Sequence, residues 1–244
     1  MTNQRVSETV NTGVPTHIAI IPDGNRRWAT MKGIPILQGH QAGADRMHQV
    51  VDSLIQLGVK YLTVWGFSTD NWRRTDEEVS SLFTLLQSWI DRDVIWLHEN
   101  GVRLYHIGRF HELPERLRLI LRLALDLTAG NTGMTLNLAF NYTGRAEIID
   151  AINRLLISGI PYKKGSVPDV TEELFSHYLY TAGMPDVDLV IRTANEFRLS
   201  NFMLWQTAYS EYYFTEALWP DFDKLELEKA LKVYQERDRR FGGD

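Results

Sequence analysis

The sequence contains no cysteine, so the chain can form neither disulfide bonds nor thiolate metal sites. It also lacks any apolar run near the roughly 18 residues that a membrane-spanning helix needs. The formal net charge of −5 provides no overall positive field to attract nucleic acid or anionic lipid. The stretch from Met1 to Pro15 is polar and lacks the apolar centre of a secretion signal. These absences predict a soluble, cytoplasmic protein with a flexible N-terminal segment, residues 1–15, and no nucleic-acid partner.

The rest of the sequence predicts one α/β domain over residues 16–244. Of the 244 residues, 44% are hydrophobic, which is enough to bury one sizeable core. Short apolar runs alternate with longer stretches of helical periodicity, a pattern typical of a central parallel sheet of about six strands flanked by helices. The expected strands are residues 17–22, 61–67, 102–107, 134–139 and 188–191. The expected helices are residues 26–31, 41–57, 76–100, 114–128, 145–158, 171–180, 201–207 and 225–239, with an exposed loop at 161–168.

Residues 23–28 (DGNRRW) directly follow the first expected strand. Ligands of parallel sheets bind beyond the carboxyl ends of the strands. Gly24 permits close backbone approach, the following helix offers free N–H groups, and Arg27 adds a fixed positive charge. Asp23 would repel a phosphate unless a metal lay between them, which indicates Mg²⁺. An ordinary Asp-Gly turn that caps a helix is the alternative interpretation.

Two further polar clusters follow later strands. Residues 68–74 (STDNWRR) combine hydroxyls, an amide and arginines, which suit oxyanions. Taken alone, this cluster rather favours a capped helix start with arginines paired to nearby carboxylates. After the strand at 188–191 come Arg192, Arg198 and Ser200, which could clamp a second diphosphate in addition to the one that residues 23–28 could bind. Surface salt bridging is the alternative for these arginines.

Several blocks together resemble the undecaprenyl diphosphate synthase family of cis-prenyltransferases. The resemblance runs from end to end of the chain and keeps the order and spacing of the blocks. The matching segments are HIAIIPDGNRRWA, GHQAG, FSTDNWRR, LTAGNTG, LNLAFNYTGRAEI, DLVIRT, RLSNFMLWQ, WPDF and RRFGG.

The resemblance implies a magnesium-dependent enzyme that condenses isopentenyl diphosphate with an allylic diphosphate inside an elongated apolar cleft. It implies a homodimer, whose Arg240-Phe241-Gly242 tail reaches the partner's site, and transient membrane contact for product release. Asp23 and Glu211 would hold Mg²⁺. Asn71 would help the removal of the proton by orientation, with a diphosphate oxygen or water as the acceptor, because an amide is a poor base. The implied substrate-binding residues are Gly24, Asn25, Arg26, Arg27, Trp28, His40, Ser68, Thr69, Asp70, Trp72, Arg74, Arg192, Arg198, Leu199 and Ser200.

The expected helix at residues 76–100 carries an apolar stripe that could line the product cleft or simply pack in the core. The stripe comprises Val79, Leu82, Phe83, Leu86, Ile90, Val94 and Leu97. Gly66 and Met134 are further candidates for the cleft, because Gly66 is small and Met134 resembles a residue of the cleft floor. Neither feature predicts a product length.

Two departures from the family pattern leave alternatives open. Ile36 stands where the family usually has an arginine, and residues 193–197 (TANEF) replace a loop that is usually rich in small residues and glycine. Irregular coupling of two allylic diphosphates is therefore one alternative, and a non-catalytic partner subunit is another. The all-helical prenyltransferase architecture is excluded, because the sequence has no DDxxD motif and its α/β alternation contradicts that fold.

Overall fold

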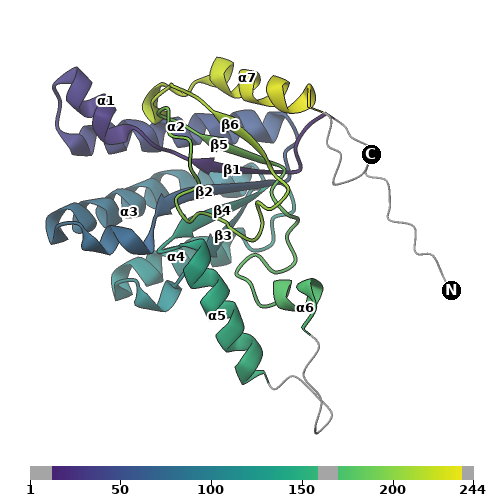
Figure 1. Cartoon of the computed structure of the whole chain (residues 1–244). Coiled ribbons are helices and arrows are strands. Elements are labelled where there is room, and N and C mark those ends of the chain that lie inside the picture. Colours follow the sequence, from purple (N-terminus) through teal and green to yellow (C-terminus); the bar gives the residue numbers. More distant parts are fainter. Residues whose placement is uncertain (1–12, 159–169, 238–244) are drawn as a thin grey trace, which may run out of the picture.

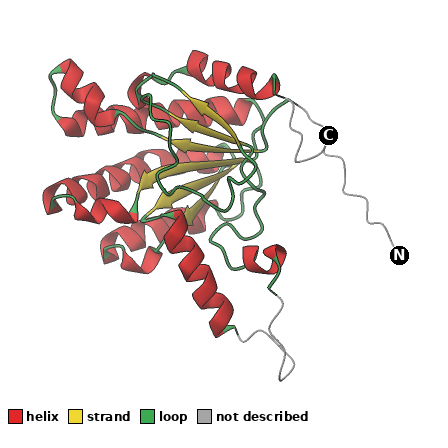
Figure 2. Cartoon of the chain, viewed as in Figure 1, coloured by secondary structure: helices red, strands yellow, loops and turns green. Residues whose placement is uncertain are grey.

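The computed structural model describes residues 13–158 and 170–237 of the chain. Its centre is a six-stranded parallel sheet with the order β3-β4-β2-β1-β5-β6. Figure 2 shows the strands as one layer between helices. The strands are β1 (His17–Ile21), β2 (Tyr61–Phe67), β3 (Arg103–Ile107), β4 (Thr135–Phe140), β5 (Leu189–Arg192) and β6 (Glu211–Phe214). The predicted α/β fold with a central parallel sheet is confirmed.

The two faces of the sheet are covered by different elements (Figure 1). The larger core lies on the face that packs against α2 (Ile36–Gln56), α3 (Asp76–Glu99), α4 (Glu115–Thr128) and α7 (Lys224–Gln235). On the other face, Ala19, Ile21 and Val190 pack against Phe202 and Met203 of an irregular segment. Near that segment, α5 (Gly144–Ile157) packs on α6 (Glu172–Ser176). The short helix α1 (Asn25–Lys32) lies at the carboxyl end of β1 and packs on α2.

The carboxyl ends of β1 and β5 lie side by side near the middle of the sheet. Ile21 is in register with Arg192, so the segments that follow these two strands leave the sheet together. The chain builds β2, β3 and β4 on one side of β1, and β5 and β6 on the other. Such a reversal of strand order is where open parallel sheets form their ligand crevices.

Helix α2 begins at Ile36, five residues before the predicted start at Gln41. The two glycines at 39 and 43 look like helix breakers in the sequence, but here they allow α2 to approach α1 closely. A Cβ atom on Gly39 would collide with the carbonyl oxygen of Asn25 and lie 2.9 Å from the Cβ of Ala29. Close helix packing therefore explains glycine inside this helix, and it places His40 on α2.

Three other sequence predictions differ from the structure. Residues 201–207 form turns, because Asn201 and Met203 adopt left-handed backbone angles that a right-handed helix cannot contain. The half-buried edge strand β6 was not predicted, and α6 ends at Ser176 although the expected helix extended to residue 180. The expected loop at 161–168, the tail at 240–242 and most of the segment 1–15 lie outside the described residues.

Among the described residues, none of the helices combines the length and the apolar composition that a membrane span requires.

Replacing Gly39 with alanine should destabilise the protein by about 1–3 kcal/mol, because the new methyl group overpacks the contact between α1 and α2. In a helix without this contact, alanine would instead be favoured over glycine by about 1 kcal/mol. Urea unfolding measures the difference. Gly130→Ala is the matched control, since no atom lies within 4 Å of its added Cβ, and equal effects of both substitutions would contradict the close packing.

Candidate active site

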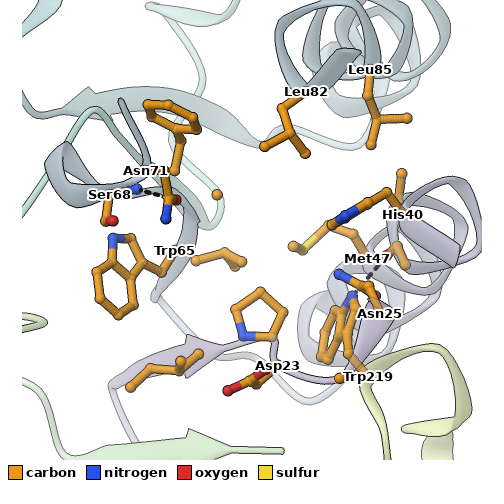
Figure 3. Close-up of a pocket in the computed structure, with 18 of the residues that line it drawn as sticks. Asp23, Asn25, His40, Met47, Trp65, Ser68, Asn71, Leu82, Leu85 and Trp219 are labelled. Atoms are coloured by element: carbon orange, nitrogen blue, oxygen red, sulfur yellow. Dashed lines mark hydrogen bonds between the residues drawn. The ribbon is translucent and has the colours of Figure 1, made fainter. Parts of the chain in front are cut away.

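A cavity of about 530 Å³ opens at the carboxyl ends of the central strands. Its walls come from the segment after β1, from α2 and α3, and from the strands β2 and β4. In Figure 3, Asn25 and His40 lie on one side of the cavity, Ser68 and Asn71 on the other, and Asp23 at the edge between them. The cavity thus joins residues from three of the polar clusters that the sequence analysis selected.

The segment after β1 forms a tight turn into α1. Gly24 has a φ of 107°, a left-handed angle, and a Cβ there would lie 2.9 Å from Leu218 and 3.0 Å from Ala194. Glycine is therefore needed both for the backbone angle and for the space. The turn leaves Asp23, Gly24, Asn25, Arg26 and Arg27 on the cavity wall, next to the N-terminus of α1.

Arg192 and Asp23 form the ion pair at the centre of the site. The Nη2 atom of Arg192 donates to Oδ2 of Asp23 at 3.0 Å, and the Arg192 side chain is only 4% exposed. Nη1 donates to Oγ of Ser200 at 2.8 Å and to the carbonyl oxygen of Arg198. The Arg192 guanidinium is thus held by β5 on one side and by the loop before residue 201 on the other, with its charge directed at the cavity mouth.

Two glutamates hold the remaining arginines of the cavity wall. Glu78 lies 2.8 Å from Arg74 and 3.6 Å from Arg26. Glu196 lies 3.2 Å from Arg27 and also pairs with Arg198. With Asp23 on Arg192, each of these five arginines contacts a carboxylate of the same chain. The ion pair of the alternative interpretation is thus present for Arg74, which also lines the cavity, and a role of Arg74 in substrate binding remains a prediction.

His40 lines the cavity beside this charged group. Burial is the main cause that lowers the pKa of His40, and the positive charges of Arg74 and Arg26 lower it further, while Glu78 raises it. A lowered pKa keeps the imidazole neutral at neutral pH, so it can donate one hydrogen bond without adding charge.

Asn71 belongs to the 3-10 helix η1 (Thr69–Arg73), which follows β2, and Ser68 caps the N-terminus of that helix. The two residues cap each other: Asn71 Oδ1 accepts from the backbone N–H of Ser68 at 2.9 Å, and the Ser68 side chain accepts from the backbone of Asn71. Because Oδ1 is already engaged, the amide NH₂ of Asn71 is the group that it can offer to a ligand.

The interior of the cavity is apolar, and the structure divides the predicted stripe of α3. Leu82 and Leu86 line the cavity, together with Leu85 and Trp89, which the stripe did not include. The other stripe residues, Val79, Phe83, Ile90, Val94 and Leu97, are part of the core or pack against it. Gly66 also lines the cavity, whereas Met134 is a buried core residue.

Other predicted site residues lie outside the cavity wall. The Trp28 indole donates to Asp221, the Trp72 indole donates to Asn141, and Thr69 bonds to Thr143. Asp70 is exposed, and Leu199 packs on the other face of the sheet. Ser200 reaches the site only through its hydrogen bond with Arg192.

Glu211 is not close to Asp23 within the chain. It is in register with Leu189 at the start of β6, about 10 Å along the strand from the level of Arg192. Its carboxylate instead accepts from Arg237. A shared magnesium site for Asp23 and Glu211 therefore remains a prediction.

The residues of the cavity fit a metal that is held jointly with a ligand, and do not fit a metal cage made of protein alone. Among the described residues, no group of three or more His, Asp or Glu side chains is placed to hold a metal ion. Asp23, however, presents one carboxylate at the mouth of an arginine-rich cavity. Mg²⁺ commonly binds to one or two carboxylates and completes its coordination with substrate phosphates and water.

Comparison with models of known protein families shows the family to which this chain belongs. The family model described as "Putative undecaprenyl diphosphate synthase" matches residues 21–242. The chain belongs to this family. An isoprenyl transferase of Clostridium perfringens is 47% identical over 230 residues, which cover 94% of this chain and 90% of the relative. An isoprenyl transferase of Streptococcus pyogenes serotype M3 is 48% identical over 234 residues, 94% of each chain.

Solved structures agree with this family. Lavandulyl diphosphate synthase from Lavandula x intermedia, in complex with dimethylallyl diphosphate, matches with a TM-score of 0.88 and 36% identity, covering 94% of this chain and 99% of that one. A "probable undecaprenyl diphosphate synthase" from Campylobacter jejuni matches with a TM-score of 0.78 and 31% identity, covering 93% and 98%.

Sequence reasoning selected all five arginines of the cavity wall. Among the lining residues to which it gave no role, Glu196 and Trp219 make polar contacts at the site. Glu196 was noted only as part of an unusual loop, and Trp219, whose indole donates to the carbonyl oxygen of Gly43, lies in the matching WPDF segment without an assigned role. The signal for Glu196 was its position between Arg192 and Arg198, but the sequence does not show which arginines a carboxylate will contact.

Glu196→Gln should bind inorganic diphosphate about tenfold more tightly than the unmodified protein, a difference of about 1.4 kcal/mol. The substitution removes the negative charge that competes for Arg27 and Arg198. Isothermal titration calorimetry at fixed ionic strength measures the affinity. Glu236→Gln, which breaks an exposed pair with Lys232 on α7, is the control of equal charge change. Weaker binding by Glu196→Gln would show that this carboxylate does not compete with the ligand.

Proposed function

We propose that the chain condenses isopentenyl diphosphate with an allylic diphosphate to give a cis-prenyl diphosphate. Membership of the family supports prenyl-chain condensation by a transferase. The observation that carries the proposal is the division of one cavity into an arginine-rich mouth and an apolar interior. A prenyl diphosphate has the same division, since a charged diphosphate is joined to a purely apolar chain.

Two groups of arginines at the mouth can each bind one diphosphate. The first group comprises Arg26, Arg27 and Arg74, close to the N-terminus of α1 and to His40. The second comprises Arg192 and Arg198. Guanidinium groups form paired hydrogen bonds with phosphate oxygens, and a helix N-terminus adds free N–H donors. We assign the first group to the allylic substrate and the second to isopentenyl diphosphate.

Asp23 is the residue that would hold Mg²⁺, together with a substrate diphosphate. When bound, Mg²⁺ would neutralise charge on the diphosphate leaving group. In the structure Asp23 is paired with Arg192. A diphosphate that engages Arg192 would free the Asp23 carboxylate for the cation, so the two ligands would favour each other's binding.

The reaction places different demands on the residues of the mouth and of η1. The allylic C–O bond breaks, and the diphosphate leaves with the bonding electrons, stabilised by the arginines. The double bond of isopentenyl diphosphate then attacks the allylic carbon, which leaves a cationic carbon on the isopentenyl unit. Loss of a proton from the carbon next to this cationic carbon forms the new double bond. The Asn71 amide is too weak a base to take this proton. Asn71 orients the diphosphate, whose oxygen is the better acceptor.

The chain is proposed to act as a homodimer through α5. Ile149, Ile152 and Leu156 are 54%, 39% and 69% exposed, and their spacing places them on one face of this helix. A contiguous exposed apolar stripe of this kind is typical of a protein interface. Contact with a membrane would serve release of the apolar product, as proposed from the family resemblance.

Irregular coupling of two allylic diphosphates remains the second candidate function. The loop at residues 193–197, which motivates this alternative, does shape the mouth of the cavity. Ala194 and Asn195 adopt left-handed backbone angles, and the Ala194 carbonyl oxygen accepts a hydrogen bond from Arg27. Ile36, the other motivation, is the first residue of α2 and does not line the cavity.

An assay of condensation tests the proposal. Purified protein is incubated with isopentenyl diphosphate and dimethylallyl, geranyl or farnesyl diphosphate, with Mg²⁺ or EDTA, and products are resolved by mass. Products should grow in five-carbon steps, only with Mg²⁺, and Asp23→Asn should reduce the rate by at least about 100-fold. Asp91→Asn, an exposed carboxylate on α3, is the control.

Other outcomes of this assay would contradict the proposal in different ways. Products formed from dimethylallyl diphosphate alone would establish irregular coupling. Absence of product from every combination would favour a non-catalytic partner subunit.

Replacing both Ile149 and Leu156 with glutamate should convert the dimer to a monomer, because two charges would be buried in an apolar interface. Sedimentation velocity measures the mass of the particle. Leu123→Glu, at a 62% exposed leucine of α4, is the control. If Leu123→Glu dissociated the dimer and the α5 double substitution did not, the dimer interface would be formed by α4 and the proposal for α5 would be contradicted.

A further inference from the structure

The cavity has a measurable depth along the elements that form it. On α3 the lining residues run from Glu78 at the charged mouth to Trp89, eleven positions further on. At a rise of 1.5 Å per residue, this distance is about 16 Å. On α2 the lining residues run from His40 to Met47. Figure 3 shows Met47 of α2 and Leu85 of α3 on the walls of the cavity. The described lining residues of both helices thus stop within a few turns of the mouth.

Polar contacts between α2 and α3 lie just beyond these last lining residues. His48, which follows Met47, pairs with the buried carboxylate of Asp93 at 3.2 Å and packs on the ring of Trp96 at 4.1 Å. Arg92 connects the same carboxylate to Asp45 of α2. This cluster ties the two helices together one turn below Trp89 and gives a growing apolar chain no favourable path between them.

Trp89 is the bulkiest side chain at the deep end of the cavity. It is 8% exposed, and its indole N–H is buried without a hydrogen-bond acceptor among the described residues. The other tryptophans of the cavity wall, Trp65 and Trp219, donate to the carbonyl oxygens of Tyr142 and Gly43. A buried donor without an acceptor is unfavourable. Hydrogen bonding therefore does not explain a tryptophan at this position, whereas its volume does.

We propose that Trp89 sets the maximum length of the product by closing the deep end of the cavity. The inference rests on the proposed condensation reaction and adds to it a determinant of product size. Each condensation moves the apolar chain one isoprene unit deeper, away from the diphosphate, which the arginines hold at the mouth. Growth stops when the end of the chain meets the indole ring. Further entry would require the ring to move, together with the polar cluster that joins α2 and α3 behind it.

The test compares the products of Trp89→Leu and Trp89→Phe with those of the unmodified protein. Both substitutions keep the site apolar and reduce its bulk, leucine more than phenylalanine. The longest product should gain at least one five-carbon unit in Trp89→Leu, with a smaller shift in Trp89→Phe, while the single-turnover rate of the first condensation stays within about threefold. Trp205→Leu, at a tryptophan that packs on Phe175 outside the cavity, should leave the length unchanged.

The outcomes separate this inference from the function on which it rests. An unchanged longest product in both Trp89 variants, with the first condensation intact, overturns the role of Trp89 and leaves the condensation activity standing. Longer products from Trp205→Leu as well would also overturn it, since loosened packing in general would then be the cause. If Trp89→Leu fails to fold, Trp89→Phe decides the question. Absence of condensation by the unmodified protein would instead contradict the proposed function.

Discussion

A buried arginine without a counter-charge is too costly to keep in a folded protein, and the site of this chain is organised around that constraint. Arg192 ends β5 with its side chain 4% exposed, and Asp23, just beyond β1, supplies the compensating carboxylate. The pair joins two segments that are 169 positions apart in sequence. It depends on the parallel register of β1 and β5, which places Ile21 opposite Arg192. The Gly24 turn, the start of α1 and the loop that holds Ser200 are all positioned relative to this pair.

The same need for counter-charge explains why the mouth of the cavity contains acidic residues. Several arginines gathered at one cavity mouth would repel one another, and Glu78 and Glu196 reduce that repulsion while keeping the guanidinium groups in place. Below the mouth, the walls contain aliphatic and aromatic side chains of α2, α3 and the sheet. One cavity therefore combines a charged mouth with an apolar interior, which is the division that the proposed prenyl diphosphate substrates also have.

The sequence predicted the elements whose burial pattern is uniform. β1 is buried at every position and was recognised from its apolar run, whereas β6 is half-buried throughout and shows no such pattern. The start of α2 was misplaced because Gly39 acts there through contact with α1, which is a tertiary effect. In the site, the rule that ligands bind beyond strand ends selected Asp23 and Arg192 before their contact was known. Ion-pair partners such as Glu196 and the orientation of Trp89 depend on packing between distant segments, which periodicity does not encode.

The central claim is that one molecule occupies both parts of this cavity, with its diphosphate at the arginines and its chain along α3. A crystal structure with a non-hydrolysable farnesyl diphosphate analogue tests it most directly. The account predicts diphosphate oxygens within hydrogen-bonding distance of the cavity arginines, and an isoprenoid chain that passes Leu82 and Leu85 toward Trp89. A diphosphate bound elsewhere, or a chain that lies in the second cavity beside β3, between α4 and α5, would contradict it.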